Sequence, residues 1–198
     1  TRRSSDLGHK LYECYRDAGL PEGVFQVVYG DGPALGNSMI TNPLISGFAF
    51  TGSKSVGMKL SSLLSTNYPK PALMELGGKN AAIICAKADL ESAAEGCVKS
   101  AFGLTGQKCS ALSRLYVHSS IKTEFLKKLV DKTKALVMGN PELKETFVGP
   151  LINQKAWDRH MKAVSEAKRD GKIHVGGEDI RNQKEFSQGF FVEPVIAE

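Results

Sequence analysis

Short apolar runs alternate with helical periodicities along the first part of the chain, and this alternation is the feature that most constrains the fold. β-Branched and aromatic residues are concentrated in residues 24–29 and 47–50, and another apolar run covers residues 72–75. Between these runs, apolar residues recur at helical spacing in residues 34–40 and 54–65. Strand, helix and strand in such short succession form a parallel sheet, so the chain is predicted to be an α/β protein.

The rest of the chain continues the same alternation. We predict helices over residues 6–18, 89–102, 120–137 and 154–169, the third capped by Ser119 or Ser120, and strands over residues 81–85, 114–118, 173–175 and 190–195. The strand over residues 81–85 is apolar throughout, which is typical of a parallel strand buried on both faces. Gly77 and Gly78 separate two strands, and we predict a domain boundary there, with residues 1–76 in one domain and residues 77–198 in another.

Composition excludes several classes of protein. The chain of 198 residues is 41% hydrophobic and 24% charged, as expected of a soluble globular protein. It contains no apolar run long enough to span a membrane, and no signal peptide opens it. The net charge of +5 is spread over predicted helix surfaces without a nucleic-acid-binding motif. We therefore expect a cytoplasmic protein with no membrane partner and no nucleic-acid partner.

Four cysteines are present: Cys14, Cys85, Cys97 and Cys109. None belongs to a CxxC pair or has a histidine at ligand spacing, so we expect neither a metal site nor a disulfide framework. Cys109 closely follows Gly106 among small and polar residues, where a substrate can reach the sulfur. It is the candidate nucleophile, whereas Cys97 has the spacing of a helical core residue. The alternative for Cys109 is a small buried hydrophobe.

Glu75 is the candidate general base. It closes an apolar run directly before the two glycines, at the predicted mouth of the sheet, where a carboxylate can accept a proton from water or from a thiol. Burial of the same carboxylate within the strand would be costly. The alternative is a strand-end carboxylate that faces solvent and has no part in catalysis.

Two motifs in this order resemble the paired signatures of the aldehyde dehydrogenase superfamily. They are Glu75-Leu76-Gly77-Gly78-Lys79 and Gly106-Gln107-Lys108-Cys109. Residues 50–57 resemble the family's cofactor segment, and residues 18–28 resemble the helix-to-strand connection that precedes it. The resemblance covers about residues 7–198. It implies the second half of a Rossmann-type cofactor domain followed by an α/β catalytic domain with a mostly parallel sheet.

The resemblance also implies a chemistry. Cys109 attacks an aldehyde to give a thiohemiacetal, hydride leaves to NAD or NADP, and water activated by Glu75 hydrolyses the resulting thioester. The cofactor-binding residues that the resemblance implies are Gly52, Ser53, Gly57, Leu76 and Gly77. The turn over residues 51–53 also suits a phosphate on physical grounds, because a helix N-terminus presents free N–H groups. Any strand-to-helix turn, however, can require a glycine and a serine cap.

Other residues of the motifs refine or weaken this interpretation. The ending Ser113-Arg114 resembles that of pyrroline-5-carboxylate (glutamate semialdehyde) dehydrogenases, and related semialdehyde enzymes share much of it. The family's ribose-binding segment would fall at residues 2–5, where its acidic residue is replaced by Ser5, so NAD and NADP both stay open. The family's oxyanion-binding asparagine and its later glutamate motif are absent. We therefore expect a central fragment of an enzyme whose full-length form is a homo-oligomer.

Two other functions stay open. Cys109 and His118 could form a thiol hydrolase, although a predicted strand separates them. The chain could also be a truncated, non-catalytic fragment that acts as an assembly or interaction module.

Overall fold

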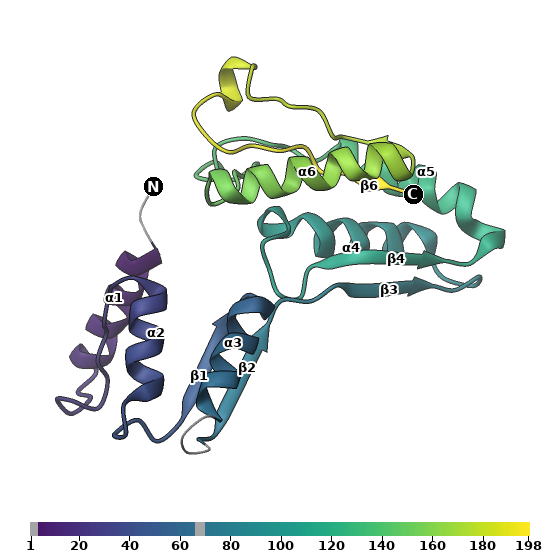
Figure 1. The fold of residues 1–198 in the computed structure, drawn as a ribbon. Helices are drawn as coiled ribbons and strands as arrows, with labels where there is room; N and C mark the ends of the chain where they lie inside the picture. The colour runs from purple at the N-terminus through teal and green to yellow at the C-terminus, as the bar shows by residue number, and fades with distance from the viewer. Residues whose placement is uncertain (1–3, 66–69) are drawn as a thin grey trace. The chain divides into compact units, whose positions relative to one another are not determined.

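The computed structural model describes residues 4–65 and 70–198, and it divides the chain into two compact units, Thr1–Leu76 and Gly77–Glu198 (Figure 1). The division falls at the boundary that the glycine pair suggests. The role of each unit stays a prediction, because compactness alone does not assign a ligand or a reaction to either unit.

The first unit is built around a two-stranded parallel sheet. Its elements are α1 (Ser4–Asp17), α2 (Gly32–Thr41), β1 (Phe48–Gly52), α3 (Lys54–Leu64) and β2 (Ala72–Leu76). β1 and β2 pair in register from Phe48 opposite Ala72 to Gly52 opposite Leu76. The buried side chains of this unit come from α2 and α3 and pack on one face of the sheet; they are Ile40, Leu60 and Leu64, against Phe48, Phe50 and Met74.

The strand predicted over residues 24–29 is wrong. The segment is irregular, and Val24, Val28 and Tyr29 are 67%, 63% and 51% exposed. Phe25 packs edge-on against Tyr15 of α1, with ring centroids 5.3 Å apart. A β-branched run forms a strand only where another strand pairs with it, and none does so here among the described residues.

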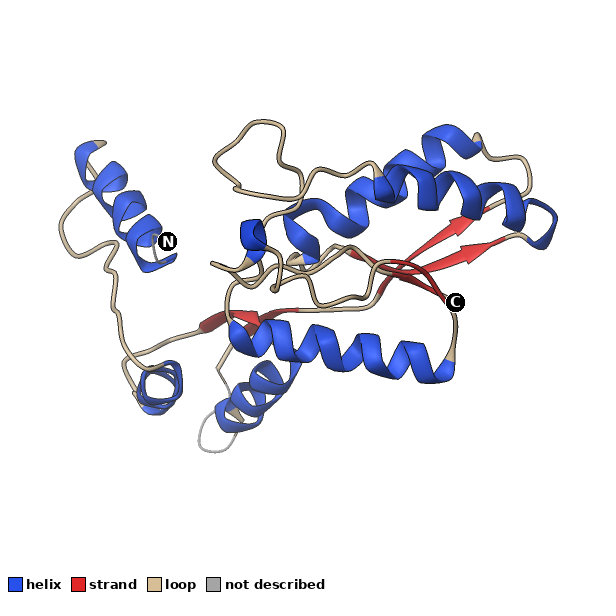
Figure 2. Cartoon of the chain, turned by 90° about the horizontal axis from the view of Figure 1, so that it is seen from above, coloured by secondary structure: helices blue, strands red, loops and turns tan. Residues whose placement is uncertain are grey.

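The second unit also has a parallel strand pair, with helices against it. Its elements are β3 (Asn80–Ile84), α4 (Leu90–Phe102), β4 (Leu112–Val117), α5 (Lys122–Lys134), α6 (Gln154–Asp170), β5 (Ile173–Val175) and β6 (Ile196–Ala197). β3 and β4 run side by side in the same direction, whereas β5 and β6 are antiparallel (Figure 2). No helix in residues 4–65 and 70–198 combines the length and the apolar character that crossing a membrane would require.

The core of the second unit lies between the β3–β4 pair and the helices α4 and α5. Phe125 is 1% exposed there and Cys97 is buried beside it, as the helical spacing of Cys97 predicted. On the other face of the strands, the register partners Ile83 and Tyr116 are 74% and 53% exposed. The prediction that β3 is buried on both faces is therefore wrong, because helices of this unit cover only one face.

Two further predictions fail in the second unit. Ser119 and Ser120 do not cap α5 but lie in a short 3₁₀ turn, Ser119–Ile121, whose cap is the His118 ring. The segment over residues 190–195 forms only one bridge, from Phe190 to Leu151, and the strand that follows it is β6. Pro194 contributes to this difference because proline has no N–H to donate to a strand ladder.

Candidate active site

The loop between α4 and β4 carries Cys109, and its backbone is unusual. Leu104 and Thr105 adopt left-handed conformations with φ of 53° and 58°, and Gly106 follows with φ of 69°. The left-handed region costs little for glycine but is unfavourable for a leucine and still more so for a β-branched threonine. Contacts with other parts of the unit must therefore hold this segment in place.

Part of that support comes from residues 149–152, far along the chain. The Thr105 hydroxyl donates to the Gly149 carbonyl at 3.0 Å, and the Gln107 side-chain oxygen accepts from the Ile152 N–H at 3.0 Å. The Gln107 amide nitrogen also donates to the Leu104 carbonyl at 3.3 Å. These bonds fix both ends of the left-handed segment against one neighbouring loop.

Cys109 lies at the tip of a tight turn. The Ala111 N–H donates to the Lys108 carbonyl at 3.2 Å, which places Cys109 and Ser110 at the two central positions. The Cys109 side chain is exposed. The Asn80 side-chain amide, at the start of β3, donates to the carbonyls of Cys109 at 2.7 Å and Ala111 at 3.3 Å. A thiol thus stands free on a turn whose backbone is tied to the sheet.

The other cysteines differ from Cys109 in their surroundings. Cys97 is in the core, and burial raises the pKa of its thiol, so it is a poor nucleophile. Cys14 and Cys85 are exposed, so exposure alone does not distinguish Cys109. In the two described stretches of chain, no three side chains of the metal-binding types gather closely enough to hold an ion.

The turn between β1 and α3 has the features of an anion site. The Ser53 hydroxyl caps α3 by accepting from the Val56 N–H at 3.4 Å. Over the described ranges, the N–H groups of Lys54 and Ser55 have no acceptor, so they are free at the positive end of the helix. A phosphate of a dinucleotide would suit these donors, and the donor set therefore fits such a cofactor.

Gly52 and Gly57 act differently from Ser53. A Cβ on Gly57 would lie 2.4 Å from the Leu76 Cδ2 atom, so the absence of a side chain lets α3 pack closely on β2. A Cβ on Gly52 would lie 2.5 Å from the Phe50 ring. The Gly57 N–H is used within the helix by the Ser53 carbonyl, at 3.0 Å. Gly57 and Leu76 thus shape the cofactor turn by packing rather than by offering a donor.

Glu75 lies one residue before the end of β2, directly opposite Thr51 at the end of β1. Because the two strands are parallel, Glu75 and the β1–α3 turn share the carboxyl edge of the sheet, where α/β proteins bind ligands. The Glu75 side chain is exposed. Glu75 belongs to the first unit, whereas Gly77 and Cys109 belong to the second, so the approach of the carboxylate to the thiol stays a prediction.

The thiol hydrolase formed by Cys109 and His118 is not supported. His118 follows the last residue of β4, and the thiol turn precedes the first, so a strand of six residues, roughly 20 Å long, separates them. The His118 ring nitrogen Nδ1 lies 2.9 Å from the Ser120 hydroxyl and accepts from the Ser120 N–H. His118 is thus a local cap. The implied ribose segment lies outside the described residues at residues 2 and 3.

Sequence reasoning missed the side chains that hold the thiol turn. Asn80, Gln107 and Thr105 occur within or beside the motifs, but their bonding partners are backbone groups that no sequence pattern identifies. The signal available for Asn80 was a polar amide directly before a predicted apolar strand, a position where a side chain can reach the adjacent loop.

Comparison with known proteins gives consistent results. The model of the "Aldehyde dehydrogenase family" matches residues 3–198. The 1-pyrroline-5-carboxylate dehydrogenase of Anoxybacillus flavithermus is 36% identical over 195 residues, which are 96% of this chain and 37% of that protein. A second such enzyme, from Halalkalibacterium halodurans, is 38% identical over 192 residues, covering 94% of this chain and 36% of the relative. The chain thus spans little more than a third of the length of these relatives.

Solved structures show the same similarity. HpcC from Thermus thermophilus matches with a TM-score of 0.90 and 34% identity over 96% of this chain and 38% of that one. A 1-pyrroline-5-carboxylate dehydrogenase from Thermus, solved with bound NAD, matches with a TM-score of 0.88 and 30% identity over 98% of this chain and 37% of that one. The predicted α/β fold is therefore confirmed, and the chain belongs to the aldehyde dehydrogenase family.

Proposed function

We propose that the protein is an NAD(P)-dependent aldehyde dehydrogenase in which Cys109 is the nucleophile and Glu75 is the general base. The observation that most supports this proposal is the exposed thiol on a turn held by Asn80, in a chain of this family. In this proposal the unit Thr1–Leu76 binds the cofactor and the unit Gly77–Glu198 supplies the thiol. The active protein is proposed to be a cytoplasmic homo-oligomer.

The chemistry begins at the thiol. The Cys109 sulfur, as the thiolate, attacks the aldehyde carbon, and the carbonyl electron pair moves to oxygen, where the Cys109 N–H can donate to it. NAD or NADP, held at the β1–α3 turn by Ser53 and the free N–H groups of Lys54 and Ser55, supplies the acceptor for the hydride. Glu75 then takes a proton from the water that attacks the thioester, and the thiolate leaves.

The proposed substrate is a semialdehyde, with glutamate semialdehyde as the first to test. The relatives from Anoxybacillus flavithermus and Halalkalibacterium halodurans, both described as 1-pyrroline-5-carboxylate dehydrogenases, support this choice. Solved relatives with other substrates, such as a succinate-semialdehyde dehydrogenase from Burkholderia pseudomallei at 30% identity, make a panel of semialdehydes the appropriate comparison.

The test is aldehyde-dependent reduction of NAD or NADP by the purified protein. We expect Cys109→Ser to lower the rate by at least about a thousandfold, because a hydroxyl at this position is a far weaker nucleophile than a thiolate. Cys85→Ser is the matched control, since Cys85 is also exposed and follows a strand of the same unit. Substantial activity in the Cys109→Ser variant would contradict the proposal.

Native alkylation gives a second test that needs no turnover. We expect Cys109 to react faster with iodoacetamide than the other cysteines, as measured by peptide mass spectrometry at short times. Cys97 should react slowest because it is buried and burial raises the pKa of its thiol. Equal labelling of Cys85, Cys97 and Cys109 would count against Cys109 as the nucleophile.

A non-catalytic assembly or interaction module is the second candidate function. It is favoured by one observation, the exposed apolar pair Ile83 and Tyr116 on the uncovered face of a parallel sheet, because parallel sheets are normally covered on both faces. Absence of aldehyde oxidation, together with alkylation of Cys109 no faster than that of Cys14, would support this candidate over the enzyme.

A further inference from the structure

Asn80 ties the start of β3 to the turn that carries Cys109. The side-chain nitrogen of an asparagine bears two hydrogens, and here it faces two carbonyl oxygens, those of Cys109 at 2.7 Å and Ala111 at 3.3 Å. Asn80 is the first residue of β3, in register with Leu112, the first residue of β4. The register of the strand pair shifts between Asn80 and Ala81, so the amide stands at an irregular position beside the turn.

The two peptide groups that flank Cys109 are both fixed. The peptide before it is held because the Lys108 carbonyl accepts from the Ala111 N–H at 3.2 Å, and the peptide after it is held by Asn80. In a trans peptide the N–H points away from the C=O, so the Cys109 N–H points out of the turn. Among the residues that the structure describes, that N–H has no acceptor.

From this geometry we propose that Asn80 is a positioning residue: by holding the Cys109 and Ala111 carbonyls, it keeps the Cys109 N–H directed outward as a donor to the oxyanion that forms when the thiol attacks a carbonyl. The inference rests on the proposed function of Cys109 and names a further residue for the same site. Asn80 does not touch the reacting atoms; it acts through the backbone of the turn.

The contribution of Asn80 can be separated from simple access to the sulfur by comparing two reagents. With p-nitrophenyl acetate, a C–S bond forms as the carbonyl electrons move to oxygen, and p-nitrophenolate then leaves as the thioester forms. The thiol proton passes to solvent. This reaction passes through an oxyanion, whereas alkylation by iodoacetamide displaces iodide and forms none. Only the first reagent therefore responds to the direction of the Cys109 N–H.

The experiment measures both rates at Cys109 by peptide mass spectrometry in the wild type and in Asn80→Ala and Asn80→Asp. The aspartate has the shape of the asparagine but no N–H to donate. We expect both variants to acylate Cys109 about tenfold more slowly than the wild type, with alkylation changed by less than about twofold. The acylation effect is smaller than the ~10²–10³ for loss of an oxyanion donor, because the N–H is still present but less well aligned.

Arg114→Ala is the matched control. The Arg114 side chain also bonds across the strand pair, donating from Nε to the Lys79 carbonyl at 2.9 Å, but it does not touch the turn. Its acylation-to-alkylation ratio should equal that of the wild type, as should the ratio for Cys14. An unchanged ratio in the Asn80 variants, or equal losses in both reactions, would overturn the inference. Because neither reagent requires a nicotinamide, failure of aldehyde oxidation alone would reject the proposed function and leave this test intact.

Discussion

The two units bury their apolar side chains to different extents. In the second unit, strand and helix residues meet in one cluster, where Ala94 is fully buried and Phe125 is 1% exposed. In the first unit the buried side chains come only from α2 and α3, and the least exposed of them, Ile40, is 4% exposed. An apolar segment of that unit, residues 24–29, stays largely exposed.

This difference shows which elements depend on their neighbours. Short helices are marginal in isolation and are stabilised mainly by packing of an apolar face. The helices α4 and α5 have that packing, whereas α1 contacts its unit chiefly through Tyr12 and Tyr15 against Phe25. The unit that carries the thiol should therefore be the more stable of the two, and substitutions can test that order.

The largest effect is expected from Phe125→Ala in the core of the second unit. Removal of a fully buried phenylalanine ring costs about 3–5 kcal/mol of unfolding free energy, from lost burial and from the cavity that remains. Unfolding in urea, followed by fluorescence of Trp157, the only tryptophan of the chain, reports on the second unit.

Leu60→Ala is the matched substitution in the first unit. Leu60 is 7% exposed, and we expect its loss to cost about 2–3 kcal/mol, near the lower end for buried leucines, because its surroundings are less closed. Hydrogen exchange of peptides from α3 measures this effect. A larger cost for Leu60→Ala than for Phe125→Ala would break the comparison between the units.

The elements that could be predicted from the sequence are those with local signals. A helix was predicted over residues 54–65 and is observed at Lys54–Leu64, with Ser53 as its cap. Another was predicted over residues 89–102 and is observed at Leu90–Phe102, with Asp89 as its cap. Residues 24–29 and 190–195 were predicted wrongly because the β state of a segment depends on a partner strand, which local sequence does not supply.

The candidate site could be predicted only in part. The sequence indicates Cys109 as a reactive thiol, and its proposed role stays a prediction. The support for its turn could not be predicted, because Gly149 and Ile152 lie far along the chain and bond through backbone atoms. Nor could the left-handed conformation of Leu104 and Thr105, which opposes the preference of both residue types.

A second, smaller effect compares two glycines, one in each unit. Gly106→Ala should cost about 1–2 kcal/mol, because its φ of 69° disfavours any Cβ and the added atom would lie 3.0 Å from the Ala101 carbonyl oxygen. Gly57→Ala should cost about 1 kcal/mol, because the added Cβ would meet the Leu76 Cδ2 atom and the helix gains alanine propensity in return.

Shortening the contacting side chain separates the two causes. Leu76→Val should remove much of the penalty of Gly57→Ala in the double variant, since the conflict lies between two side chains. No side-chain change should relieve Gly106→Ala, whose penalty is in the backbone. Denaturant unfolding measures the Gly106 variant, and peptide-resolved hydrogen exchange measures the Gly57 cycle. Strictly additive effects of Gly57→Ala and Leu76→Val would contradict the packing role of Gly57.

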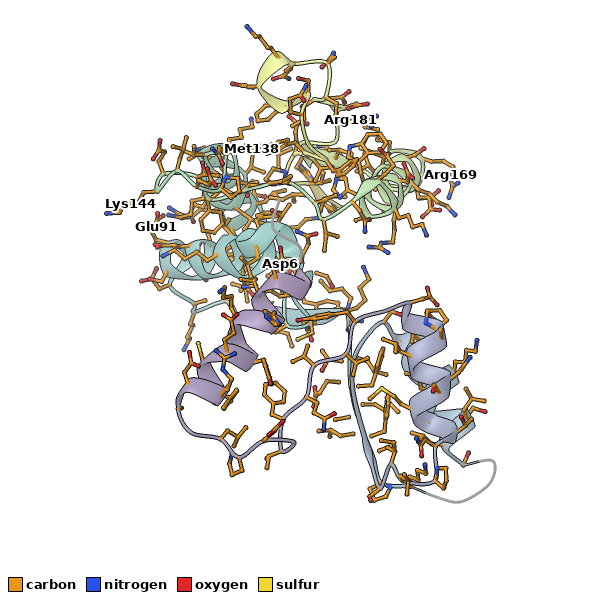
Figure 3. All side chains as sticks on the ribbon, turned by 90° about the vertical axis from the view of Figure 1, so that its left-hand side faces the viewer. Asp6, Glu91, Met138, Lys144, Arg169 and Arg181 are labelled. Atoms are coloured by element: carbon orange, nitrogen blue, oxygen red, sulfur yellow. The ribbon has the colours of Figure 1, made fainter. Side chains whose placement is uncertain are left out.

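The smallest effect concerns acid stability and compares ion pairs between helices with ion pairs within one. Glu91 of α4, labelled in Figure 3, lies 2.5 Å from Lys132 and 3.3 Å from Lys128, both of α5. These lysines lower the pKa of Glu91, so the pairs stabilise the fold above the ordinary glutamate pKa of about 4.3 and are lost as the pH falls through the lowered value. In α1, Lys10 likewise lowers the pKa of Glu13, but within a single helix.

Glu91→Gln should therefore flatten the loss of stability with acid in the second unit, whereas Glu13→Gln should change it less in the first. The reason is that a pair three residues apart along the chain persists partly in an unfolded or frayed helix, so its protonation differs little between the two states. A pair that joins α4 to α5 exists only when both helices are docked. The check is the urea midpoint by Trp157 fluorescence between about pH 3 and pH 7, with peptide exchange for α1. Equal flattening by the two substitutions would mean that α1 is held by tertiary contacts as firmly as α4, and the proposed order of stability between the units would then be wrong.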